Sequence, residues 1–359
     1  MTASPPLRSD GVPVVPPEAA RPYVVGRSVR KQTCLAINGL TNLKLGARTR
    51  ARLSVIYVAR LRRPMAIATA RLEGRSIAEE RTRACAALLA RAGPGVRPAT
   101  LASVHRPVSG PFELYRRRQQ KSAEALGVRF RDEALSGTSD DAELYERIRS
   151  LASDPTVHGV IVEHPLPAPF DFHRAVDELP VEKDVDGLST SSLGRLVSSR
   201  PIHVPAVARA AVRIARHYGL VPAGERVAVI GRSETVGLPL AHLLLERGTD
   251  ATVTIAHSKT VDLASAISGA RTIFSCVGHP KLLDRSNVPK GAAIIDIGLS
   301  SAPDPARPGR SLSVGDADAA TLEGWARAIT PVPGGVGPVT VAELMGNLID
   351  AWARQEHVA

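Results

Sequence analysis

Residues 226–245 read RVAVIGRSETVGLPLAHLLL, and this stretch decides the fold class. Its first five residues are apolar apart from Arg226 and predict a buried strand. A turn from Gly231 to Gly237 follows, and the apolar run after it predicts a helix through Leu245. A strand, a glycine turn and a helix in this order are typical of a doubly wound nucleotide-binding domain.

The turn differs from both common phosphate-binding motifs, because it is neither G-x-G-x-x-G nor a loop that ends in Gly-Lys-Ser/Thr. By itself it also fits a tight turn that needs glycine, such as Gly231, for backbone reasons. Two neighbours favour a phosphate site. Free N–H groups at a helix N-terminus attract anions, and Arg232 and Ser233 add a forked cation and a hydroxyl.

The end of the next expected strand bears on which cofactor is bound. Residues 256–260 read AHSKT, so Ser258 and Lys259 stand where an acidic residue would select NAD. Hydroxyl groups and cations at this place accommodate the 2′-phosphate of NADP. The sequence therefore predicts NADP as the cofactor, with Gly231, Arg232, Ser233 and Ser258 among its contacts.

Strands and helices alternate along the rest of the chain. Ser76 and Glu79 fit a capping box at the start of the first helix. The alternation predicts an α/β fold of two domains with parallel sheets, and a last helix that packs back on the first domain. The expected strands are 99–104, 128–131, 158–162, 226–230, 251–255, 272–277 and 293–297, and the expected helices are 76–92, 112–126, 141–152, 206–217, 237–245 and 339–354.

Composition excludes several classes of protein. The chain has 359 residues, of which 44% are apolar, so it can bury the cores of two domains. Its three cysteines lie far apart, which excludes a disulfide scaffold or a paired-cysteine zinc site and fits a reducing compartment. We expect no metal. No apolar run is long enough to span a membrane, and the predicted location is cytoplasmic.

The net charge of +11 is concentrated in residues 1–64, which hold twelve Lys and Arg side chains against two acidic ones. The remainder of the chain is nearly neutral, so we expect no nucleic-acid partner. Three interpretations of the segment stay open. It is a disordered extension, a targeting peptide, or a part that does not belong to the native protein, which would then start at Met65.

Five motifs in fixed order resemble one family, the bifunctional methylenetetrahydrofolate dehydrogenase / methenyltetrahydrofolate cyclohydrolases. The similarity covers about Arg71 to Ala351. The motifs are KDVDG at 183–187, VIGRS at 229–233 with VG-x-P at 236–239, ATVT at 251–254 with HS at 257–258, IDIG at 295–298, and TPVPGGVGP at 330–338.

This resemblance implies an N-terminal α/β catalytic domain and a Rossmann-like NADP-binding domain, with an interdomain cleft for folate. We place the catalytic domain at 65–205 plus 338–359 and the NADP-binding domain at 206–337. The implied reaction passes a hydride from 5,10-methylenetetrahydrofolate to NADP, after which water opens the methenyl product to 10-formyltetrahydrofolate. A homodimer is implied by the family alone.

The resemblance also assigns residues to the site. Tyr115 matches the tyrosine that stacks on folate, and Asp186 matches the aspartate that accepts hydrogen bonds from the pterin. Leu299, next to the 295–298 motif, is assigned to the cofactor. Pro333, Gly334 and Gly335 are expected in a rigid loop that contacts substrate, and the Val332–Pro333 bond is expected to be cis.

Two positions depart from the family pattern. The pattern Tyr-x-x-x-Lys-x-Lys places a catalytic lysine four residues after the tyrosine, but here Gln119 stands there. Lys121 remains, and it is expected on a different, solvated face of the helix. Glu163 replaces the glutamine that contacts the lysine in the family. Two close carboxylates, Glu163 and Asp186, would raise one pKa, so Glu163 is a candidate acid/base.

Three functions follow as hypotheses. The first is an NADP-dependent methylenetetrahydrofolate dehydrogenase in which hydrolysis is weakened or lost with the lysine. The second is a non-catalytic relative that binds folate or nucleotide. The third is another NADP oxidoreductase on the same scaffold.

Overall fold

The computed structural model describes residues 68–107, 111–136, 140–164, 166, 170–303 and 311–358. Residues 66–359 form one compact unit. The predicted N-terminal extension, 1–64, lies outside the described residues. Within the part described, no helix is both long enough and apolar enough to cross a membrane.

The first half of this unit, here called the N-terminal lobe, is built on a three-stranded parallel sheet in the order β3-β2-β4. The central strand β2 is buried along its whole length, as expected of a strand covered on both faces. The elements of this lobe are β2 (Thr100–His105), α4 (Pro111–Ala125), β3 (Arg129–Ala134), α5 (Asp141–Ser153), β4 (Gly159–Val162), α6 (Phe172–Asp177) and α7 (Thr190–Val197).

The second half, the C-terminal lobe, is built on a six-stranded sheet in the order β1-β11-β8-β7-β5-β6, with parallel pairing throughout. A separate two-stranded ribbon pairs β9 with β10 in antiparallel fashion. The elements are β1 (Ala70–Arg71), β5 (Arg226–Ile230), α9 (Gly237–Leu245), β6 (Thr252–Ala256), α10 (Leu263–Ile267), β7 (Thr272–Ser275), β8 (Ala293–Asp296), β9 (Ser300–Pro303), β10 (Ser311–Val314), α11 (Ala319–Leu322) and β11 (Ala328–Ile329).

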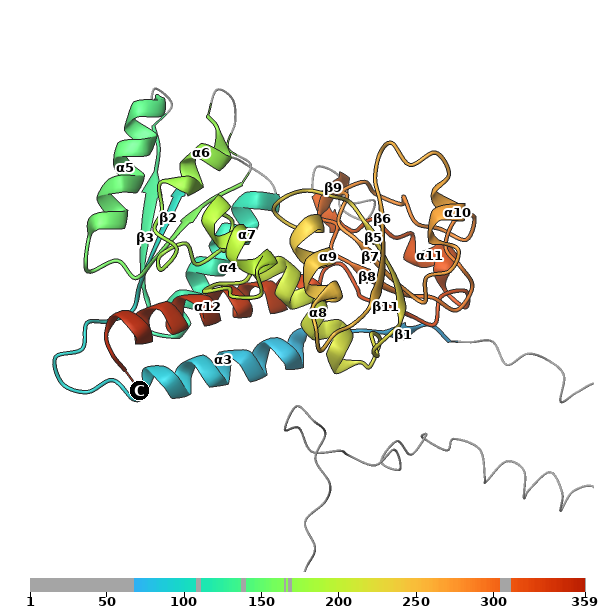
Figure 1. Ribbon diagram of the computed structural model, residues 1–359, viewed down its shortest axis with the longest axis horizontal. Coiled ribbons are helices and arrows are strands. Elements are labelled where there is room, and N and C mark those ends of the chain that lie inside the picture. Colours follow the sequence, from blue (N-terminus) through green and yellow to red (C-terminus); the bar gives the residue numbers. More distant parts are fainter. Residues whose placement is uncertain are drawn as a thin grey trace, which may run out of the picture. The chain divides into compact units, whose positions relative to one another are not determined.

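Three long helices complete the fold: α3 (Arg75–Leu89), α8 (Ala206–His217) and α12 (Val336–Gln355). Figure 1 shows α12 and α3 side by side, with α8 against the same helix. Apolar residues of α12, including Leu348 and Trp352, share one core with Leu101 of β2 and Ile161 of β4. The predicted return of the last helix to the first domain is therefore confirmed.

The predicted α/β class with two parallel sheets is confirmed, and most elements lie where the apolar pattern placed them. The predicted capping box is wrong. Helix α3 begins after Gly74 without a side-chain cap, and Glu79 instead accepts a hydrogen bond from Arg75 Nε at 2.9 Å. Our domain boundaries stay a prediction. Strand β1 lies in the range that we placed in the catalytic domain, but it pairs with β11 in the sheet of the C-terminal lobe.

Candidate active site

The candidate catalytic side chains meet at the carboxyl ends of strands β2 and β4. Glu163 directly follows β4, and its backbone N–H donates to the Val104 carbonyl of β2 at 2.9 Å. Its carboxylate accepts from the hydroxyl of Ser103, a fully buried β2 residue, at 3.0 Å. Strand pairing thus fixes both the backbone and the side chain of Glu163.

Helix α4 brings Tyr115 and Gln119 to the same place. They are four residues apart, so both lie on one face of the helix. Gln119 is buried, and its amide lies close enough to Glu163 and Tyr115 to lower the pKa of both. Its Oε1 atom has no hydrogen-bond partner within the described structure. A buried, unpaired amide oxygen is unusual, and it offers an acceptor to a ligand or a water.

Burial raises the pKa of Glu163 to about 7, against an ordinary value of 4.5. Hydrogen bonds from Ser103 and Gln119 and the charge of Arg116 lower this pKa, but they do not offset the loss of hydration, and the charge of Asp132 raises it further. A carboxyl group with this pKa exchanges protons near neutral pH, as a general acid or base must.

Asp186 lies in a loop that another aspartate holds in shape. The buried carboxylate of Asp184 accepts from the backbone N–H groups of Gly187, Leu188 and Ser189 at 3.0, 3.2 and 2.8 Å. Gly187 has a φ of +70°, which favours glycine. This arrangement leaves the carboxylate of Asp186 free of the loop's own N–H groups.

The backbone N–H of Ala206, the first residue of α8, lowers the pKa of Asp186 instead. Burial, with the charges of Asp184 and Glu163, raises the pKa of Asp186 to about 7. Burial, together with the charges of Asp186 and Glu163, also raises the pKa of Tyr115. The phenol is therefore neutral at physiological pH.

Sequence reasoning placed Tyr115, Gln119, Glu163 and Asp186 in one site, and the structure brings them together closely enough to affect one another's titration. Lys121 is exposed, as expected. Sequence reasoning missed Ser103 and Asp184. Asp184 stands in the recognised KDVDG motif, so its alternation with Asp186 was an available signal, whereas an isolated serine in a strand offers none.

The candidate cofactor turn follows β5 in the C-terminal lobe. Gly231 has a φ of +114°, and a Cβ there would lie 2.7 Å from Cys276 Sγ. A Cβ on Gly237 would lie 2.3 Å from the Gly231 carbonyl oxygen. Both glycines are thus required for the tight turn, which brings backbone to the N-terminus of α9. A glycine turn that leads into a helix N-terminus is the geometry at which a cofactor phosphate binds in this type of domain.

The predicted cofactor residues lie at one edge of the sheet. Ile230 of β5 pairs with Ala256 of β6, so Arg232 and Ser258, each two residues further on, follow neighbouring strand ends. Both are exposed, as is Leu299 after β8. The Ser233 hydroxyl accepts from the N–H groups of Val236 and Gly237 at 3.2 and 3.4 Å, so in this structure it caps α9.

The loop at 330–335 has the predicted cis bond between Val332 and Pro333. Its glycines pack closely on the protein itself. The Gly334 carbonyl accepts from Gly74 N–H at 2.9 Å, and a Cβ on Gly335 would lie 2.7 Å from Thr330 Cβ. Close packing thus explains the glycine at position 335, and a φ of +116° explains the glycine at position 334. Contact of Pro333, Gly334 and Gly335 with substrate stays a prediction.

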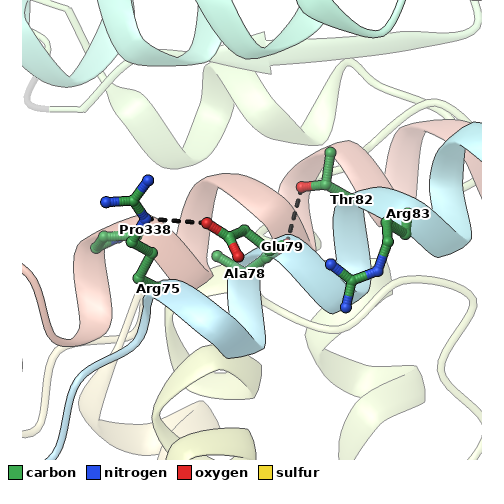
Figure 2. Close-up of a pocket in the computed structure, with 6 residues that line it drawn as sticks. All are labelled: Arg75, Ala78, Glu79, Thr82, Arg83 and Pro338. Atoms are coloured by element: carbon green, nitrogen blue, oxygen red, sulfur yellow. Dashed lines mark hydrogen bonds and ion pairs between the residues drawn. The ribbon is translucent and has the colours of Figure 1, made fainter.

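A separate surface pocket lies between α3 and the start of α12 and contains none of the predicted site residues (Figure 2). In Figure 2 the dashed line between Arg75 and Glu79 runs along α3. The residues that line it are Arg75, Ala78, Glu79, Thr82, Arg83 and Pro338. Its lining includes one acidic residue and two arginines, and none of the residues to which the chemistry above assigns a role.

Comparison with known families gives two matches, one for each lobe. Residues 72–186 match the catalytic domain of tetrahydrofolate dehydrogenase/cyclohydrolase, and residues 205–356 match the NAD(P)-binding domain of the same enzymes. The first match contains Tyr115, Gln119 and Glu163 and ends at Asp186. The second contains the glycine turn and the loop at 330–335.

Individual relatives agree. The chain is 41% identical over 281 residues to bifunctional protein FolD 1 of Frankia casuarinae, which covers 78% of this chain and 98% of the relative. It is 38% identical over 261 residues to bifunctional protein FolD 1 of Rhodococcus jostii, covering 73% and 85%. Among solved structures, the methylenetetrahydrofolate dehydrogenase-cyclohydrolase of Trypanosoma brucei, complexed with NADP cofactor and inhibitor, superposes with a TM-score of 0.74 at 32% identity, covering 80% of this chain and 98% of that one.

Proposed function

This chain belongs to the tetrahydrofolate dehydrogenase/cyclohydrolase family, and we propose how its residues carry out the two reactions. The protein oxidises 5,10-methylenetetrahydrofolate to the methenyl form with NADP, and it hydrolyses that product to 10-formyltetrahydrofolate. A non-catalytic relative is not favoured, because the similar proteins bear the names of bifunctional enzymes. The observation that carries the assignment of roles is the cluster of Tyr115, Gln119, Glu163 and Asp186.

Substrate binding rests on Tyr115 and Asp186. The neutral phenol ring of Tyr115 presents an aromatic face to the flat pterin. Asp186 in its ionised form accepts hydrogen bonds from the amino and ring N–H groups of the pterin, and a carboxylate makes stronger bonds of this kind than a neutral acceptor. The Ala206 N–H favours this ionised form, since it donates to the carboxylate.

NADP supplies the hydride acceptor when it is bound. The chain's own contribution is to hold the cofactor. The turn at Gly231 would place a cofactor phosphate at the start of α9, and Arg232 and Ser258 would contact the 2′-phosphate. Exposure of both side chains supports this role, because neither is committed to a partner that phosphate would have to displace. Alignment is what hydride transfer needs most from the protein.

For hydrolysis we assign the general base to Glu163. A water molecule attacks the methenyl carbon, its oxygen forms the new C–O bond, and Glu163 takes the proton. The bond from that carbon to N5 then breaks, and N5 keeps the electron pair and takes up the proton from Glu163. The hydroxyl group on the same carbon loses its proton to solvent, and its O–H electron pair completes the C=O bond of the formyl group. Over the whole reaction the cationic substrate and water yield 10-formyltetrahydrofolate and one free proton. The unpaired Oε1 of Gln119 accepts a hydrogen bond from the second O–H of the water and takes no proton from it.

The roles are tested by assaying the two half-reactions separately. NADPH formation from 5,10-methylenetetrahydrofolate measures oxidation, and decay of added methenyltetrahydrofolate without NADP measures hydrolysis. We expect both activities in the unmodified protein and loss of both in Asp186→Asn, which keeps the shape but not the charge. A protein without either activity would contradict the assignment of catalytic roles.

A cytoplasmic homodimer is a further part of the proposal. The described cysteines, Cys85 and Cys276, are free thiols, which supports a reducing compartment. Burial raises the pKa of the Cys276 thiol to about 12, so it stays protonated. Light scattering during gel filtration measures the mass of the particle, and a monomeric mass would contradict the dimer.

A further inference from the structure

Asn347 of α12 is buried, and both polar atoms of its side chain form hydrogen bonds. Its Nδ2 atom donates to two backbone carbonyls, that of Val185 at 2.8 Å and that of Val204 at 2.9 Å. Its Oδ1 atom accepts from Arg209 Nη1 at 2.9 Å. Because a guanidinium can only donate, this contact fixes which end of the amide faces the two carbonyls.

The two carbonyls belong to two segments that meet beside Asp186. Val185 immediately precedes Asp186, and Val204 lies two residues before Ala206, whose backbone N–H lowers the pKa of Asp186. One amide group therefore joins the loop that carries the carboxylate to the segment that leads into α8.

The same two segments are pressed together elsewhere. Gly187 lies so close to the second segment that a Cβ would meet Pro205 N at 3.1 Å and His203 O at 3.2 Å. Such close backbone packing tolerates little displacement. Asn347 is the side chain within the described residues that hydrogen-bonds to both segments at once.

We propose that Asn347 is a positioning residue for the reaction, which holds Asp186 and the start of α8 in register so that the carboxylate meets the substrate. The inference rests on the proposed function, since Asp186 is there the group that binds the pterin. Asn347 itself touches no reacting atom and acts through Asp186.

The ion cluster behind Asn347 supports a fixed position for its helix. Glu343, one turn earlier on α12, is fully buried among Arg81 of α3 and Arg209 and Arg213 of α8. Gly346 gives room for this cluster, because a Cβ there would lie 2.1 Å from Arg81 Nη2. The amide of Asn347 therefore projects from a helix that is anchored to both of its neighbours.

The test needs a control that damages α12 in the same way but does not join the two segments. Gln355 is such a residue, because its Nε2 atom donates to the His158 carbonyl at 2.8 Å and to the Glu182 carbonyl at 3.5 Å, and neither carbonyl belongs to the segment that leads into α8. We would compare Asn347→Leu, which deletes the amide, with Gln355→Met. Asn347→Asp is measured alongside, because it keeps the shape and the Arg209 contact but loses the two donated bonds.

Calorimetry gives the first measurement, with tetrahydrofolate and NADP titrated separately. We expect both Asn347 variants to bind tetrahydrofolate about 10-fold to 100-fold more weakly, the effect of one misplaced charge-assisted contact. NADP binding by the Asn347 variants should stay unchanged. Gln355→Met should lower the melting temperature without weakening the binding of tetrahydrofolate. Equal tetrahydrofolate affinity in Asn347 variants and in the control would overturn the inference.

A carboxyl ¹³C titration of Asp186, assigned with Asp186→Asn, gives a second measurement that needs no substrate. The titratable groups that face Asp186 are Asp184, Glu163 and Tyr115, and Asn347→Leu alters none of them and adds no charge. Asn347→Asp is left out of this measurement, because its new carboxylate would itself raise the midpoint. Displacement of the Ala206 N–H, which lowers the pKa of Asp186, should move the midpoint upward in Asn347→Leu but not in Gln355→Met. An unmoved midpoint would overturn the inference. Failure of the unmodified protein to bind tetrahydrofolate would count against the proposed function instead, and the titration could still be read.

Discussion

Replacing Glu163 by glutamine should separate the two activities of this enzyme. The substitution keeps the size of the side chain and its contacts with Ser103 and Gln119, but an amide cannot take a proton from water near neutral pH. Removing a general base typically costs about 100-fold to 10,000-fold in rate. We therefore expect hydrolysis to fall by this factor and hydride transfer to persist, because it depends on alignment more than on a base.

The pH profile gives the reasoning a second check. If the ionised form of Glu163 is the base, hydrolysis by the unmodified protein should fall about tenfold for each pH unit below about 7, where the pKa of this carboxyl lies. In Glu163→Gln the remaining activity should lose this dependence.

The stability of the fold should depend on pH in the opposite direction: the free energy of unfolding should fall as pH rises, whereas the rate of hydrolysis should increase. Between pH 4.5 and 7, Glu163 is protonated in the folded protein and ionised in the unfolded chain, so unfolding releases a proton and rising pH destabilises the fold. The stability from this raised pKa is fully present below pH 4.5 and is lost as pH rises through about 7; the gap corresponds to at most about 3 kcal/mol. The free energy of unfolding of Glu163→Gln, compared with that of the unmodified protein, should therefore be higher at pH 8 than at pH 5.

The assay combines methenyltetrahydrofolate decay, NADPH formation and urea unfolding at pH 5 and pH 8. Glu133→Gln is the matched control, because it makes the same chemical change in the same lobe, at a carboxylate that pairs with Arg131 and Arg147 at 2.9 and 2.8 Å. Unchanged hydrolysis in Glu163→Gln would refute the assignment of the base. Equal pH dependence of unfolding in both variants would refute the raised pKa.

Other residues lead to further tests. Arg232→Ala should weaken NADP binding about tenfold to 100-fold and NAD binding far less, since only NADP has the 2′-phosphate; equal losses would remove this assignment. Ser103→Ala removes a hydrogen bond that lowers the pKa of Glu163, so the acidic limb of the hydrolysis profile should move to higher pH, and an unmoved limb would speak against that bond. Asp184→Ala leaves three N–H groups without their acceptor and should lower the free energy of unfolding by more than about 2 kcal/mol, measured by urea denaturation. Gln119→Lys combined with Glu163→Gln restores the family pair and should hydrolyse faster than Glu163→Gln alone; an equal rate would show that the lysine does not act in this site.

Long apolar periodicity made the framework predictable. The helix expected at 206–217 and the strand expected at 226–230 have these bounds in the structure, because each buries one continuous apolar surface. The four residues of the candidate site were assigned from the resemblance to the family's motifs, and helical spacing added that positions 115 and 119 share one face. Spacing depends on local sequence alone, whereas the roles of these residues were expected only from the family.

Features set by distant contacts escaped prediction. Helix α3 starts at a point fixed by Gly74, whose N–H bonds to Gly334 and whose missing Cβ admits Gly335 O; no local cap at Ser76 is needed. Strand β1 has two residues and carries no periodic signal. Asn347 reads as an ordinary polar residue in a helix, and only the folded structure shows that it joins two loops more than 140 residues away.

The placement of α12 has a consequence for how the protein is made. The N-terminal lobe takes Leu344, Leu348 and Trp352 from this helix into its core, yet these residues are translated well over a hundred residues after β4. During synthesis of the C-terminal lobe, an apolar face of the sheet of β2, β3 and β4 therefore stays exposed until well over a hundred further residues have been added. Hydrophobic surface exposed for that long attracts chaperones and proteases. Chains that stop before residue 336 should therefore be cleared from the cell rather than accumulate as a working N-terminal lobe.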